Sequence, residues 1–229
     1  MERNRILLCL AHMSDNEMKY IQEAFDTNWV VPLGPNVNGF EDDLKRFVTS
    51  VVNSKEKESS FIGEGYPQSI LPHEDNPDNL WKNSLPNLED KRVVALCSGT
   101  AAVHLSLIAL GVKAGDEVIC QSFTFCASSH PVTYLGATPV FVDSEKETWN
   151  MDPSLLEEAI KDRISKTGKK PKAIIVVYLY GMPAKIKEIL AIADKYNIPV
   201  VEDAAEGLGS RYNGQVCGTF GEYGVLSFN

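Results

Sequence analysis

The sequence lacks cysteines arranged for disulfide bonds or metal binding. They are odd in number, widely scattered and form no C-x-x-C pair: Cys9, Cys97, Cys120, Cys126 and Cys217. A disulfide framework or a zinc site normally needs paired, closely spaced cysteines. We therefore expect reduced thiols in a cytoplasmic protein.

Long apolar runs and an excess of positive charge are also missing. The run "ILLCLA" follows Arg3 and Arg5 but is too short for the core of a signal peptide. No run approaches the ~18 apolar residues that a membrane helix needs. The formal net charge of -9 argues against a protein that tracks nucleic-acid phosphates. We expect a soluble protein whose partners include no nucleic acid and no membrane.

After residue 92 the chain alternates between strand and helix patterns. Strand patterns occupy residues 92–97, 117–121, 139–143, 173–180, 199–203 and 223–229, and helix patterns occupy 99–111, 127–136, 152–164 and 184–196. Asp152 is the expected N-cap of the helix at 152–164. Strands separated by helices predict an α/β fold with a mostly parallel sheet flanked by helices. Ligands of such sheets bind beyond the carboxyl ends of the strands, so residues that follow strands are the first functional candidates.

The part before residue 92 is organised differently. Residues 14–25 predict an amphipathic helix, 28–40 an irregular crossing and 40–48 a second helix. Residues 53–91 are rich in proline and polar side chains, which predicts a loop-rich insertion. We predict an N-terminal helix and arm over residues 1–35 and a large domain over 36–229.

Several strand ends carry side chains that suit ligand chemistry. Ser98, Gly99 and Thr100 open a helix whose first N–H groups suit a phosphate, although such a start is commonly only a cap. Phe125 follows a strand and could stack on a planar ligand or pack in the core. Asp203 is a further candidate, and its simpler interpretation is a helix cap or half of an ion pair.

The order of these segments carries more information than any one of them. The motifs are "SGTAA", "SFTFCAS", "NMDP", "YLYG", "EDAAEGLG" and "GTFGEYGVLSFN". This series resembles the DegT/DnrJ/EryC1/StrS family of sugar aminotransferases, in particular its EpsN-like members used in polysaccharide synthesis. The likeness runs from about Ile21 to Asn229. It implies the aspartate-aminotransferase-like fold (type I) of transferases that depend on pyridoxal phosphate.

The resemblance also implies roles for individual residues around pyridoxal 5'-phosphate. These are Ser98, Gly99, Thr100 and Ser227 at the phosphate, Phe125 on the ring face, Asp203 at the ring nitrogen and Glu206 near the ring hydroxyl. Asp203 is the implied catalytic residue, because a carboxylate there keeps the ring nitrogen protonated. Tyr180 faces the same region, and Met182 stands where relatives tend to carry Gln.

The sequence departs from the family at its last residues. The family motif reads "SFNGNK", and its Schiff-base lysine would come after Asn229. We therefore expect the chain to be a fragment that lacks the small C-terminal domain and is inactive alone. The full-length protein is expected to be a homodimer that transfers an amino group, with glutamate as the expected donor, to a nucleotide-linked keto sugar for polysaccharide or surface-glycan synthesis. The motifs do not specify the sugar, its nucleotide or the carbon that is aminated.

Two alternatives remain open from the sequence. One is a catalytically silent module that keeps the fold for binding or regulation. The other is a dehydratase-like relative in which a histidine replaces the lysine. The residue that follows "SFNGN" would separate the alternatives.

Overall fold

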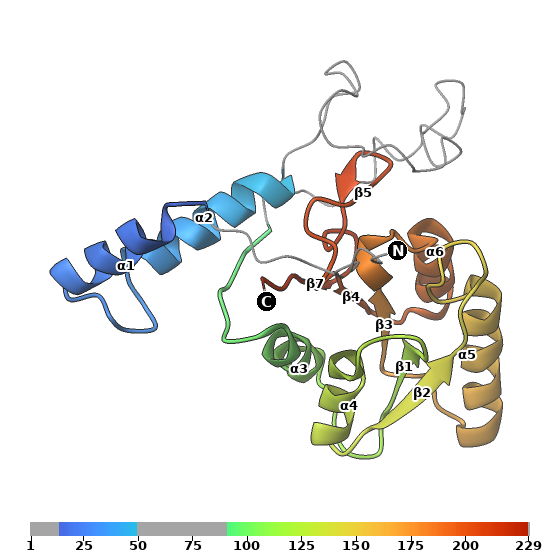
Figure 1. Ribbon diagram of the computed structural model, residues 1–229. Coiled ribbons are helices and arrows are strands. Elements are labelled where there is room, and N and C mark those ends of the chain that lie inside the picture. Colours follow the sequence, from blue (N-terminus) through green and yellow to red (C-terminus); the bar gives the residue numbers. More distant parts are fainter. Residues whose placement is uncertain (1–13, 50–90, 229) are drawn as a thin grey trace, which may run out of the picture. The chain divides into compact units, whose positions relative to one another are not determined.

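A computed structural model describes residues 14–49 and 91–228, which fall into two compact units (Figure 1). The first unit contains helix α1 (Glu17–Asp26), most of helix α2 (Pro35–Thr49) and residues 93–95. Both predicted helices are confirmed, but α2 begins within the stretch predicted to be irregular. The first turn of a helix tolerates proline, because an N–H group at that position would have no partner within the helix. Apart from Lys91, the predicted insertion lies outside the described residues, and the division at residue 35 stays a prediction.

The second unit is built on a five-stranded parallel sheet. Its strand order is β2-β1-β3-β4-β7, with β1 at Glu117–Gln121, β2 at Thr138–Val142, β3 at Ala173–Val177, β4 at Val200–Asp203 and β7 at Tyr223–Val225. Every pairing in this sheet is parallel, as predicted. A small antiparallel hairpin joins β5 (Arg211–Tyr212) to β6 (Gln215–Val216) through Asn213 and Gly214, which both have positive φ.

Helices cover both faces of this sheet (Figure 1). One core cluster joins strand residues to α3 (Gly99–Ala109) and α4 (His130–Tyr134), and the other joins them to α5 (Pro153–Thr167) and α6 (Ile186–Tyr196). Asp152 caps α5 through the N–H groups of Ser154 and Leu155, as the sequence predicts. Short 3-10 turns lie at η4 (Cys126–Ser128) and η5 (Leu179–Gly181).

The strand predicted over residues 92–97 is wrong, because this segment is irregular in the structure. Its apolar residues favour a strand, yet Val94 and Leu96 are exposed and no described strand pairs with the segment. Strand propensity alone does not hold an extended segment without a neighbouring ladder. The predicted last strand is likewise shorter than expected and ends at Val225.

The alternation of side chains in β4 decides which residues face each layer. Val201 belongs to the cluster with α3 and α4, whereas Val200 and Ala204 belong to the cluster with α5 and α6. Successive strand residues point to opposite faces, so Glu202 and Asp203 leave the strand in opposite directions. Among the described helices, none has the length and apolar character that crossing a bilayer requires.

Candidate functional site

The start of α3 meets the end of the chain segment that follows β7. Ser98 caps the helix, and its Oγ accepts the N–H of Ala101 at 3.2 Å. A Cβ added to Gly99 would lie 3.4 Å from Cβ of Ser227 and 3.5 Å from its Oγ. The structure therefore brings together the predicted residues Ser98, Gly99, Thr100 and Ser227. Free N–H groups at a helix start, with a hydroxyl beside them, suit an anion.

Asp203 ends β4 with its carboxylate buried, at 5% exposure. Its Oδ2 accepts the hydroxyl of Ser128 at 2.6 Å, and its Oδ1 accepts the N–H of Ala205 at 3.2 Å. Burial raises the pKa of Asp203 and the negative charge of Glu206 adds to the rise, while these two hydrogen bonds act against it. The described residues provide no ion pair for this carboxylate, so the simpler interpretation of Asp203 as half of an ion pair finds no support.

Ser128 was missed by the sequence reasoning. It lies in η4 at 1% exposure, and its Oγ also lies 2.8 Å from the hydroxyl of Thr124. Thr124 and Ser128, two of the three hydroxyl side chains in "SFTFCAS", lie four residues apart, and this spacing is only a weak signal. Only the tertiary structure shows that they lead to Asp203.

Phe125 lies at the same edge of the sheet with its ring 77% exposed, which is not the core packing that a lone Phe usually finds. Phe123, two residues earlier, makes an edge-on contact with Trp149 at a centroid distance of 6.1 Å. Trp149 was not predicted. It adopts a left-handed φ of 62°, which is uncommon for a bulky residue, and its ring is 59% exposed.

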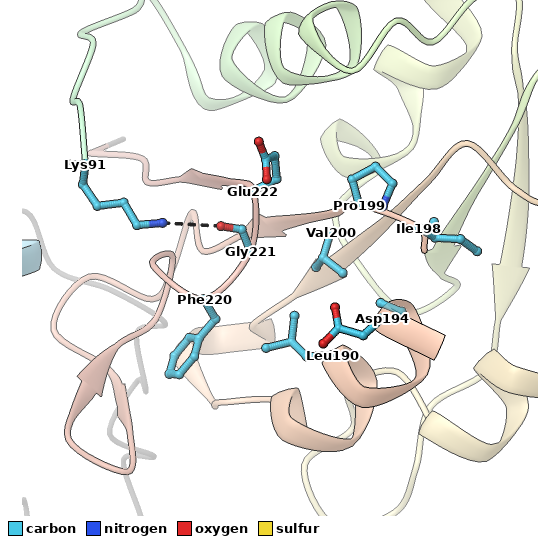
Figure 2. A pocket seen from close by; sticks show the side chains of 10 residues that line it. Lys91, Leu190, Asp194, Ile198, Pro199, Val200, Phe220, Gly221 and Glu222 are labelled. Atoms are coloured by element: carbon cyan, nitrogen blue, oxygen red, sulfur yellow. Dashed lines mark hydrogen bonds between the residues drawn. The ribbon is translucent and has the colours of Figure 1, made fainter. Parts of the chain in front are cut away.

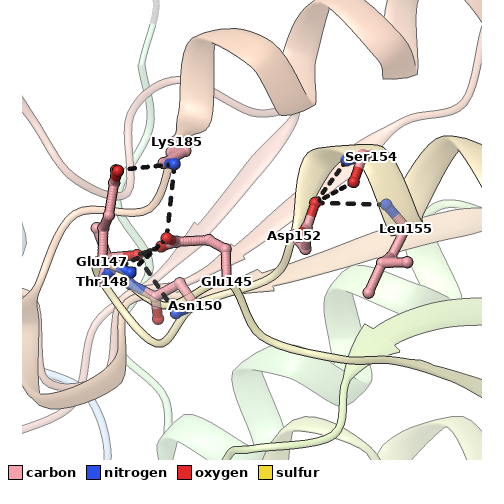
Figure 3. Close-up of polar contacts among 8 residues, drawn as sticks. All are labelled: Glu145, Glu147, Thr148, Asn150, Asp152, Ser154, Leu155 and Lys185. Atoms are coloured by element: carbon pink, nitrogen blue, oxygen red, sulfur yellow. Dashed lines mark hydrogen bonds and ion pairs between the residues drawn. The ribbon is translucent and has the colours of Figure 1, made fainter.

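The loop that carries Trp149 is pinned by charged and polar contacts (Figure 3). Glu145 accepts the N–H groups of Glu147 at 2.7 Å and Thr148 at 2.8 Å, and Lys185 pairs with Glu145 at 3.5 Å. Burial opposes ionisation of Glu145, but the hydrogen bonds from Thr148 and Glu147 and the charge of Lys185 hold its pKa below the usual value. The loop is therefore fixed by its own backbone N–H groups and by Lys185, which precedes α6.

Two buried amides tie this loop to its neighbours. Asn150 accepts the N–H of Leu179 at 2.9 Å and donates to the carbonyl of Met182 at 2.9 Å. Gln121 donates to the carbonyl of Phe123 at 2.8 Å. Sequence reasoning missed both amides, although Gln121 ends a strand and Asn150 begins the motif "NMDP". They hold the backbone after β1 and β3 in fixed positions.

Glu206 braces the turn after β3. Its Oε2 accepts the N–H of Tyr180 at 2.6 Å, and Tyr180 itself has a left-handed φ of 51°. A Cβ added to Gly181 would lie 2.8 Å from the carbonyl oxygen of Glu206, so only glycine fits this approach. The predicted role of Glu206 near a ring hydroxyl stays a prediction.

Glu202, the neighbour of Asp203, is enclosed on the other face of the sheet at 0% exposure. It accepts the N–H groups of Gly218 at 2.9 Å, Phe220 at 2.6 Å and Gly221 at 2.5 Å, and the hydroxyl of Tyr178. Burial raises its pKa, and these hydrogen bonds act against the rise. Its lone pairs are taken by fixed donors, so Glu202 holds the loop before β7 in place.

A cavity of about 480 Å³ lies elsewhere in the second unit (Figure 2). Its lining includes Pro199 and Val200, at the amino end of β4, and Lys91, whose Nζ lies 3.5 Å from the carbonyl oxygen of Gly221. Asp203 stands at the other end of the same strand. This cavity is therefore separate from the candidate site. Within residues 14–49 and 91–228, no cluster of three His, Cys, Asp or Glu side chains suits a metal ion.

These features fit a flat, phosphorylated, cationic ring. The helix start with Ser227 suits the phosphate, the exposed ring of Phe125 offers a face, and the buried Asp203 carboxylate can meet a cation. A carboxylate at 5% exposure without an ion pair is costly unless a ligand compensates its charge.

Comparison with known proteins agrees with this chemistry. The model of the DegT/DnrJ/EryC1/StrS aminotransferase family matches residues 86–229. The chain is 43% identical over 225 residues to the pyridoxal phosphate-dependent aminotransferase EpsN of Bacillus subtilis, covering 98% of this chain and 47% of that protein. It is 38% identical over 173 residues to GDP-perosamine synthase of Escherichia coli O157:H7, covering 75% and 46%. The chain thus spans about half the length of these curated relatives.

A solved relative supports the fold. The sugar aminotransferase Spr1654 of Streptococcus pneumoniae matches in its PMP form with a TM-score of 0.68 at 26% identity, over 92% of this chain and 45% of that one. Its PLP form matches with a TM-score of 0.66 at 25% identity, over the same shares. The expected α/β transferase fold is therefore confirmed.

Proposed function

Because the chain belongs to the DegT/DnrJ/EryC1/StrS aminotransferase family, we propose that the whole protein is a sugar aminotransferase. It takes an amino group from glutamate and transfers it to a nucleotide-linked keto sugar, in polysaccharide or surface-glycan biosynthesis. It acts in the cytoplasm as a homodimer. The relative GDP-perosamine synthase, named for a GDP-linked sugar, supports the substrate class.

The cofactor is pyridoxal 5'-phosphate. When bound, it supplies an electron sink for the pair left behind as a proton leaves the substrate carbon. The start of α3 at Gly99 and Thr100, with Ser98 and Ser227, would hold its phosphate. Phe125 would cover one face of its ring, and Glu206 would lie near the ring hydroxyl.

Asp203 would hold the proton on the ring nitrogen, and this residue carries the proposal. Its carboxylate is buried at a sheet edge that also bears an anion site, and no described cation pairs with it. A positive ring nitrogen compensates the buried negative charge, and the carboxylate in turn keeps that nitrogen protonated.

The 229 residues by themselves should bind the cofactor differently from the whole protein. They provide noncovalent contacts to the phosphate and the ring, whereas the family lysine that binds the cofactor covalently and moves the substrate proton follows the motif "SFNGN". We expect the 229-residue chain to bind the cofactor weakly and to show no turnover.

The test is an assay of the complete protein with glutamate and a nucleotide-linked 4-keto sugar, in which 2-oxoglutarate is measured. Formation of 2-oxoglutarate that depends on both the sugar and the cofactor is expected. Cofactor binding without 2-oxoglutarate from any GDP-, UDP- or TDP-linked keto sugar would contradict the proposal and favour a catalytically silent module.

A further inference from the structure

We propose that Ser128 and Thr124 are positioning residues, which hold the Asp203 carboxylate ionised and oriented through a chain of two hydroxyl groups. The inference rests on the proposed function, because it concerns the group that would meet the ring nitrogen of the cofactor. It goes beyond that function, because neither hydroxyl would itself contact the reacting atoms.

The inner part of this hydroxyl chain, at Ser128 and Asp203, is buried, whereas Thr124 is half-buried. The Ser128 hydroxyl lies 2.6 Å from Oδ2 of Asp203 and 2.8 Å from the hydroxyl of Thr124. Ser128 is 1% exposed and Asp203 is 5% exposed. Hydrogen bonds to a charged group are strong, and low local polarity strengthens them further. Water therefore cannot readily replace the Ser128 hydroxyl at the Asp203 carboxylate.

The direction of the chain follows from counting protons. An ionised carboxylate only accepts hydrogen bonds, so the single hydroxyl proton of Ser128 points to Asp203. The oxygen of Ser128 is then left to accept, and Thr124 must be the donor. Each donated proton polarises the next hydroxyl toward the carboxylate. Thr124 thus strengthens the bond from Ser128 without touching Asp203.

The same chain links the acid to the aromatic residue. Thr124 directly precedes Phe125, and Ser128 closes the short turn η4, in which its N–H donates to the carbonyl of Phe125 at 3.1 Å. The segment that carries the exposed ring therefore also carries the hydroxyls that orient the acid. A substitution at Phe125 is therefore expected to affect the hydroxyls of Thr124 and Ser128, and the reverse.

The experiment follows the ring nitrogen itself. Pyridoxamine 5'-phosphate labelled with ¹⁵N in the ring is bound to the complete protein, and its ¹⁵N resonance is titrated with pH. In Ser128→Ala, the Asp203 carboxylate is no longer held in position against the ring nitrogen, so its charge stabilises the ring proton less and the ring should lose that proton about one pH unit lower, a tenfold change in the protonation equilibrium. Thr124→Val should shift the midpoint in the same direction by about threefold, since it removes only the bond that orients Ser128.

Two further variants separate positioning from folding. Ser128→Thr keeps the hydroxyl and should restore the wild-type midpoint. Ser129→Ala removes the neighbouring hydroxyl, which donates to the carbonyl of Cys126 at 3.3 Å, and should leave the midpoint unchanged. If Ser128→Ala does not fold, the midpoint measured in Thr124→Val tests the hydroxyl chain by itself.

The outcomes distinguish the inference from the proposed function. Wild-type protein that fails to bind pyridoxamine 5'-phosphate would overturn both. Wild-type protein that binds it, with midpoints that do not move in Ser128→Ala and Thr124→Val, would overturn the hydroxyl chain alone. A lower melting temperature without a shift of the ring titration would count as the same negative result.

Discussion

Glu202 and Asp203 are neighbours in β4, both are buried, and burial raises the pKa of each. Their surroundings nevertheless differ. Glu202 is surrounded by four fixed donors, three of them backbone N–H groups, whereas Asp203 has one hydroxyl and one N–H. Burial alone therefore does not mark a functional acid. An acid with unfilled acceptor positions at a sheet edge is available to a ligand, and one enclosed by donors is structural.

Two buried thiols show that the two faces exclude water alike. Cys120 packs in the cluster with α3 and α4, and Cys217 packs in the cluster with α5 and α6. Both are 0% exposed. Burial raises the pKa of each from 9.0 to about 12, and at Cys217 the charge of Glu202 adds to the rise while that of Arg211 opposes it. The contrast between the two carboxylates therefore lies in the number of donors around them and not in the dryness of their surroundings.

The largest effect is expected for Glu202→Ala. The substitution leaves three N–H groups and the Tyr178 hydroxyl buried without an acceptor, which should lower the free energy of unfolding by about 3–5 kcal/mol. Urea denaturation followed by circular dichroism measures this change. Glu202→Gln keeps the size and part of the accepting ability, so it should lose less. A loss below about 1 kcal/mol for the alanine variant would contradict the structural role of Glu202.

Asp203→Asn should change the stability of the protein little but weaken cofactor binding strongly. Burial raises the pKa of Asp203 in the folded protein, so ionisation of this group lowers the free energy of unfolding as the pH rises from the unfolded to the folded pKa. The amide should therefore change the free energy of unfolding by about 1 kcal/mol or less at pH 8. Binding of pyridoxamine 5'-phosphate to the complete protein should weaken about 100-fold, because a charged partner is lost. Calorimetric titration measures the affinity. Equal binding by the variant and the wild type would remove Asp203 from its proposed role.

The effect that is smallest near neutral pH concerns the two thiols on opposite faces of the sheet. Their pKa values are higher in the folded than in the unfolded protein, so the stability they contribute is complete below pH 9 and is lost as the pH rises toward 12. Each should lower the free energy of unfolding by about 1.4 kcal/mol per pH unit in that range. Cys120→Ala and Cys217→Ala should each remove an equal share of this slope in denaturation curves. A slope that neither substitution reduces would contradict the burial of the two thiols.

Much of the fold could be predicted from the sequence because its signals are local. The strand at 117–121, the cap Asp152 and the alternation of strands and helices depend on patterns within a few residues, and all were predicted. The strand over 92–97 was wrong, because its pattern does not specify a pairing partner. The start of α2 at Pro35 was missed because proline suits both a loop and a first helical turn.

The candidate site was predicted only in part. The resemblance singled out Asp203 and the residues around Gly99, and the structure brings Gly99 and Ser227 within contact distance. Ser128, Asn150 and Gln121 were not singled out, because each acts through a partner far away in the sequence. Trp149 was overlooked, since nothing local indicates that a tryptophan will be held outward by a strained backbone.

The sequence by itself determined the parallel α/β architecture and the order of motifs that identifies the family, because hydrophobic periodicity and turn residues act over short range. The resemblance already singled out Asp203, but only the tertiary structure decided that donors enclose Glu202 and leave acceptor positions open on Asp203. That decision depends on donors that lie 16 to 19 residues after Glu202 and 75 residues before Asp203, and such distances close only when the sheet forms.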